Sequence, residues 1–139
     1  MIRNAFAAVV ICAAFAGAPA LAAPVKLTAT LTGAAETPPG KADGTGGFTV
    51  TADPDSNDFC FTLWVDKIGK PTMAHLHSGA AGVNGPPILT LEVTGKDSDA
   101  CLAVDKEKLD PIVADPSAYY VNVHTAEFPA GAVRGQLTK

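Results

Sequence analysis

The chain has 139 residues, a formal net charge of −4 and only 17% charged residues. This acidic balance argues against nucleic acids and anionic membranes as partners. The sequence contains no Gly-x-Ser-x-Gly elbow, no phosphate-cradling glycine loop and no HExxH motif, so it does not favour an enzyme with a standard catalytic constellation.

The N-terminal segment has the pattern of a signal peptide. Arg3 precedes an apolar run of about a dozen residues, which is too short for a convincing membrane span. Ala20 and Ala22 supply the small residues that signal peptidase requires. We therefore expect cleavage after Ala22 and export to the periplasm or the medium. The product, residues 23–139, should be one soluble domain without stable membrane insertion.

Alternation of apolar and polar residues predicts strands through most of this domain. The apolar faces are Leu27, Ala29 and Leu31; Phe48, Val50 and Ala52; Phe59, Phe61, Leu63 and Val65; Leu89, Leu91 and Val93; and Tyr119, Val121 and Val123. Clusters of glycine, proline and aspartate separate these runs. The pattern predicts an all-β fold, an antiparallel β-sandwich or Greek-key barrel of about eight strands. At most one short helix is expected, after Asp105 and limited by Pro111.

Two cysteines, Cys60 and Cys101, remain after the predicted cleavage. An even pair in a small exported domain predicts a disulfide. It would close a loop of about 40 residues, which the chain-entropy model values at roughly 3–4 kcal/mol. A redox pair or a thiolate metal site would need closer spacing or more soft ligands.

The three histidines of the chain lie in two short stretches. His75 and His77 belong to "AHLHSG", and residues two apart on a strand point the same way. His124 belongs to "NVHTAEFPAG". If the two strands are neighbours, the three imidazoles form a workable set for copper or zinc, with a fourth position open to water or a substrate. The alternative is that they make only surface hydrogen bonds.

The strand that ends near His124 should have one apolar and one polar face. Val121 and Val123 are expected in the core. Tyr120, Asn122 and His124 alternate with them and should therefore face outward. The histidine cluster is accordingly predicted on the outer, polar side of the sheet.

Arg134 is the only arginine after residue 22, against eight lysines. Its planar guanidinium suits a carboxylate or another anion. One hypothesis is a bidentate pair with Glu36 or Glu127 that fixes a loop, and the other is an anion guide beside a metal. Both glutamates lie in the pattern A-E-x-P-x-G, which occurs twice. A polar binding site would then involve Glu36, Asn122, Glu127 and Arg134.

Three stretches carry a resemblance to a known family: "LTGAAETPPG", "AHLHSGAAGVNGPPILTLEV" and "YYVNVHTAEFPAGAVRGQL". They resemble the CHRD domain family, named after chordin, and cover nearly all of the expected mature chain. The resemblance implies an exported, all-β, non-enzymatic module that binds an extracytoplasmic protein or a small ligand. The segment "FCFTLWV", with the later cysteine, is similar to bacterial members with a disulfide.

A fainter likeness is to the copper–zinc superoxide dismutase sandwich. It implies that His75, His77 and His124 are copper ligands and that Arg134 guides superoxide. The sequence departs from that family because a fourth histidine and the zinc loop are missing. The implied site would hold copper alone, on three imidazoles.

Overall fold

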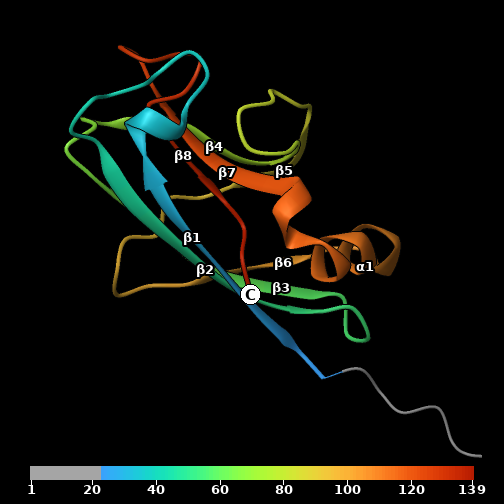
Figure 1. The fold of residues 1–139 in the computed structure, drawn as a ribbon. Helices are drawn as coiled ribbons and strands as arrows, with labels where there is room; N and C mark the ends of the chain where they lie inside the picture. Colours follow the sequence, from blue (N-terminus) through green and yellow to red (C-terminus); the bar gives the residue numbers. More distant parts are fainter. Residues whose placement is uncertain (1–22) are drawn as a thin grey trace, which may run out of the picture.

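The computed structural model describes residues 23–139, and the predicted signal peptide lies outside them. The strands are β1 (Val25–Thr32), β2 (Thr45–Asp53), β3 (Asp58–Asp66), β4 (Pro71–Ser78), β5 (Pro87–Leu91), β6 (Ala100–Ala103), β7 (Tyr119–Thr125) and β8 (Val133–Gln136). One α-helix, α1 (Lys106–Ala114), and two short 3-10 turns, Gly33–Ala35 and Pro116–Ala118, complete the fold (Figure 1). The all-β prediction with one short helix is confirmed.

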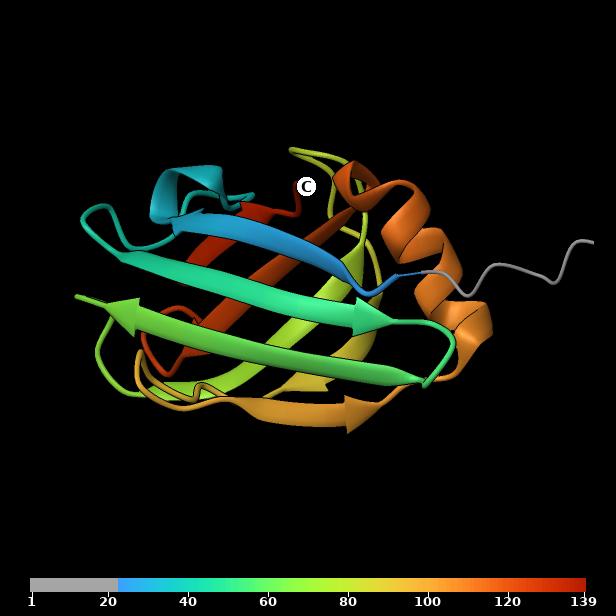
Figure 2. The same ribbon diagram turned by 90° about the horizontal axis from the view of Figure 1, so that it is seen from below.

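All eight strands belong to one antiparallel sheet, in the order β5-β4-β7-β8-β1-β2-β3-β6. The sheet curls into a half-barrel, so its two halves face each other. Figure 2 shows β1, β2 and β3 in front, with β4 and β7 crossing behind them and α1 at one end. The halves join where β1 meets β8, at the pair Thr32 and Arg134.

The core lies between the two halves and is built from the apolar faces that the alternation predicts. Phe48, Phe59 and Phe61 are buried, with ring centroids 5.6–6.3 Å apart. Leu109 and Ile112 of α1 are also fully buried. Their packing against the core stabilises the helix although Pro111 lies inside it. Burial of an apolar side chain stabilises the fold by about 1.5–3 kcal/mol.

The two edge strands of the sheet differ from the sequence prediction. Strand β5 ends at Leu91, so Val93 lies beyond the strand. Strand β6 was not predicted, because only four residues pair with β3 and they lack a clear apolar alternation. The disulfide is confirmed: Cys60 and Cys101 are directly opposite in the β3–β6 register and are bonded.

Among the residues that the structure describes, no helix has the length and apolar character needed to cross a membrane.

Candidate metal centre

Three adjacent strands bring the candidate residues together on the face of the sheet that points away from the core. Because β7 lies between β4 and β8, a residue of β7 has a neighbour on each side. His75 of β4 is opposite Asn122 of β7, which is in turn opposite Arg134 of β8. His77 of β4 is opposite Tyr120 of β7. The pairing of β4 with β7, which the histidine hypothesis requires, is therefore present.

The three imidazoles converge. His75 Nδ1 and His124 Nε2 are 3.2 Å apart, and one ring nitrogen from each histidine lies within 4.8 Å of the others. The ring centroid of His75 is 5.1 Å from that of His124 and 5.5 Å from that of His77. These three side chains form the one cluster within residues 23–139 in which three groups that commonly bind metals approach this closely.

Backbone carbonyls fix the orientation of two of the rings. His77 Nδ1 donates to the Gly85 carbonyl at 2.7 Å, and His124 Nδ1 donates to the Pro129 carbonyl at 3.0 Å. A carbonyl oxygen only accepts hydrogen bonds, so each Nδ1 carries the proton and each Nε2 of a neutral ring carries a lone pair. His77 Nε2 is buried and has no hydrogen-bond partner among the described residues.

The surroundings favour neutral imidazoles. Burial lowers the pKa of His75, and the neighbouring His124 and His77 lower it further. Burial also lowers the pKa of His124, against the opposing effect of its bond to the Pro129 carbonyl, and His77 adds to the lowering. Both rings are therefore in the unprotonated form, which is the form that binds metal ions, at neutral pH.

The prediction that Tyr120, Asn122 and His124 face outward is correct for the side of the sheet and wrong for their exposure. They point away from the apolar core, yet they are only 2%, 3% and 8% exposed. The loop of residues 79–86 folds back over this face and closes it. Its contacts include Gly79 N–H to the Ala118 carbonyl and the bond from His77. The polar face of β7 is thus a second buried layer.

Arg134 holds this loop in place. Its Nη2 donates to the carbonyls of Ala80 and Val83 at 2.8 and 3.0 Å, and its Nη1 donates to Asn84 Oδ1 at 3.2 Å. The guanidinium lies 3.4 Å from the centroid of the Tyr120 ring, a cation–π contact. Tyr120 in turn stacks on His77, with ring centroids 4.8 Å apart.

The predicted bidentate pair of Arg134 with a glutamate does not form among the described residues, because loop carbonyls take its donors. Glu127 is exposed in the turn after β7. Glu36 is buried near Arg134 without contacting it as an ion pair. Arg134 is itself only 1% exposed, so its guanidinium is not open to an approaching anion.

Glu36 lies behind the histidines and is connected to them through Asn122. Its carboxylate accepts hydrogen bonds from the Asn122 side chain and the Thr37 backbone, and Oε1 has no partner within residues 23–139. Burial raises the pKa of Glu36 to about 7, although Arg134 and the two hydrogen bonds lower it. Asn122 Oδ1 lies 3.1 Å from His124 Nε2. With His124 protonated on Nδ1, both of these atoms are acceptors, so this contact is not a hydrogen bond.

The sequence reasoning missed Met73. It lies on the same face of β4 as His75 and His77, and it is directly opposite His124 in the β4–β7 register. Its side chain is 52% exposed. The period-2 pattern of "MAHLH" contained this information, because Met73 precedes His75 by two residues.

Comparison with known proteins identifies the family. No curated protein and no solved structure matches the chain. The family model of the CHRD domain matches residues 27–137, a range that includes every strand except the first two residues of β1. The match covers most of the chain and includes the three stretches that resemble this family in the sequence. The chain therefore belongs to the CHRD domain family.

Proposed function

We propose that this CHRD-domain protein is an exported, non-enzymatic module that binds one transition-metal ion through His75, His77 and His124. Copper is the first candidate, because three neutral imidazoles suit it and because divalent copper binds nitrogen sites more tightly than zinc. Zinc is the competing ion.

The observation that carries the proposal is that the buried His77 Nε2 has no hydrogen-bond partner among the described residues. Leaving a buried polar group without a partner costs about 1–3 kcal/mol. This nitrogen belongs to a cluster in which nitrogens of His75 and His124 lie within 4.8 Å. A metal ion at the centre of the cluster would satisfy all three lone pairs.

The groups behind the ring nitrogens support the same interpretation. Histidines that bind metals almost always donate their other N–H to a carbonyl, a carboxylate or a water, which fixes the tautomer. His77 and His124 do so to the carbonyls of Gly85 and Pro129. Arg134 contributes indirectly, since it fixes the loop that presents the Gly85 carbonyl.

The spacing of the nitrogens suits an ion after a small adjustment. Ligands bonded at about 2.0–2.1 Å are about 3.4 Å apart in a tetrahedral site and about 4.1 Å apart across an ion. The His75–His124 separation of 3.2 Å is about 0.2 Å below the tetrahedral value. The widest separation, up to 4.8 Å, exceeds the distance across an ion by about 0.7 Å, so binding requires a small shift of the side chains.

Export is part of the proposal. The pattern of residues 1–22 is typical of a signal peptide. The disulfide Cys60–Cys101 is compatible with an oxidising compartment outside the cytoplasm. The proposal does not include superoxide chemistry, because a guanidinium that is 1% exposed and bonded to loop carbonyls is unsuited to guiding an anion.

The test is titration of the purified, metal-free protein with copper(II) and with zinc(II), using a chromophoric chelator as competitor. We expect one ion per chain. His77→Gln should weaken binding about 100-fold or more, because it removes a ligand rather than a supporting group, whose loss already costs about 10–100-fold. Circular dichroism should show that the variant keeps the β fold.

The matched control is Glu127→Gln, which alters an exposed carboxylate. It should leave the affinity unchanged. Equal affinity in the wild type and in His77→Gln, or no binding by the wild type, would contradict the proposal.

A further inference from the structure

We propose that Met73 is a fourth ligand of this site and that its thioether makes the site selective for copper(I) over zinc. This inference rests on the proposed function, because it requires that the three histidines bind a metal. It adds a ligand that was not among the candidate residues, and it specifies the metal and its oxidation state.

The position of Met73 in the sheet supports this role. On strand β4, residues 73, 75 and 77 alternate with Ala74 and Leu76, which are buried in the core. Met73 and the two histidines therefore point to the same side. Side chains directly opposite on antiparallel strands have Cβ atoms about 4.5–5.5 Å apart, and Met73 is opposite His124. The sulfur lies two bonds beyond Cβ, so it can reach the metal position beside His124 Nε2.

Exposure changes steadily along this face of β4. Met73 is 52% exposed, His75 is half-buried, and His77 is 9% exposed beneath the loop of residues 79–86. The cluster is therefore closed at the His77 end and open at the Met73 end. An incoming ion would meet the thioether first.

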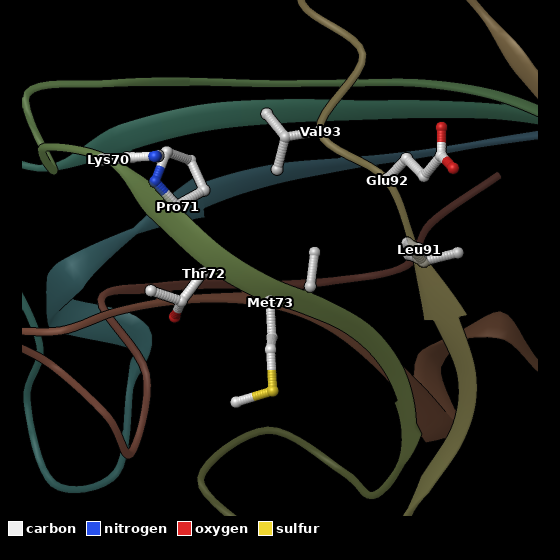
Figure 3. Close-up of a pocket in the computed structure, with 8 residues that line it drawn as sticks. Lys70, Pro71, Thr72, Met73, Leu91, Glu92 and Val93 are labelled. Carbon is white, nitrogen blue, oxygen red and sulfur yellow. The ribbon is translucent and has the colours of Figure 1, made fainter.

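The surroundings of Met73 leave its side chain free to turn. Figure 3 shows the Met73 side chain extending from β4 away from Leu91 and Val93. Met73 also lines a surface pocket of about 410 Å³ beside the start of β4. Methionine is unbranched with three rotatable bonds, so it can change rotamer at little cost.

The chemistry of the donor set then decides the metal. Thioether sulfur is a soft ligand that selects copper(I), whereas zinc sites in proteins use thiolate, imidazole and carboxylate ligands. Three imidazoles alone would suit either ion. With Met73 included, the site has one ligand that raises the affinity for copper(I) and adds little to the affinity for zinc(II).

The test compares copper(I) and zinc(II) affinities of the disulfide-bonded protein, measured without oxygen against a chromophoric chelator for each ion. Met73→Leu removes the sulfur and keeps the apolar volume. Copper(I) affinity should fall by about 10-fold or more, and zinc(II) affinity should change by less than about 2-fold. X-ray absorption should show a copper–sulfur contribution in the wild type that is lost in Met73→Leu.

The matched control is Thr72→Val, at the exposed neighbour of Met73. It should leave both affinities unchanged. Unchanged copper(I) affinity in Met73→Leu, or an equal loss in Thr72→Val, would overturn the role of the sulfur while leaving the three-histidine site intact. Failure of the proposed function differs, because the wild type would then bind neither ion.

Discussion

Replacement of Glu36 by glutamine should remove a large pH dependence of stability. Glu36 follows β1, and its carboxyl group is buried against Gly131, which precedes β8. The pKa of this group is raised from 4.5 to about 7. In the unfolded chain the group loses its proton near pH 4.5, whereas in the folded protein it keeps the proton until about pH 7. The folded state therefore binds more protons between these values, and its stability falls as the pH rises through this window.

The magnitude follows from the size of the shift. Each pKa unit corresponds to 1.36 kcal/mol, so a rise from 4.5 to about 7 makes this group's contribution about 3 kcal/mol less favourable at pH 8 than at pH 4. Glu36→Gln has no proton to lose. The free energy of unfolding of the variant, relative to the wild type, should therefore rise by about 3 kcal/mol between pH 4 and pH 8.

The assay is urea denaturation of metal-free protein at several pH values, comparing the two proteins at each pH. The comparison is necessary because the lowered pKa values of His75 and His124 act in the opposite direction, so that stability is lost as the pH falls below about 6.5. That contribution is common to both proteins and cancels. Glu127→Gln, at an exposed carboxylate, should show no such trend. A difference between Glu36→Gln and wild type that stays constant from pH 4 to pH 8 would refute the reasoning.

Two further substitutions test the fold around the site. Cys60→Ser combined with Cys101→Ser should lower the free energy of unfolding by about 3–4 kcal/mol in urea denaturation, and a loss below about 1 kcal/mol would contradict the role of the disulfide. Arg134→Lys keeps the charge but cannot donate to three loop acceptors in the same geometry. It should cost about 2–4 kcal/mol and expose the loop of residues 79–86 to proteases, and an intact loop at equal protease dose would contradict this.

The fold was predictable where the local pattern decides the structure. Alternating runs such as Phe59, Phe61 and Leu63 identify strands with one buried face, and these residues are buried. Strand β6 was missed because its four residues pair through the β3 register and the disulfide rather than through a pattern of their own. The end of β5 before Val93 likewise depends on pairing with β4, which is a nonlocal property.

The sequence predicted which residues form the candidate site, but it did not predict that they are buried. The alternation placed His75 and His77 on one face, and the pairing of β4 with β7 brings His124 to them. That face is buried because the loop of residues 79–86 covers it, and no local pattern reports which strand a distant loop will cover. For the same reason neither hypothesis for Arg134, a glutamate pair or an anion guide, anticipated that loop carbonyls take its donors.

The most direct test of the metal site is anomalous diffraction from a crystal grown with copper. We expect one copper peak per chain, about 2.0–2.1 Å from a ring nitrogen of each of His75, His77 and His124. A peak that omits His77, or copper found only at surface carboxylates, would contradict it.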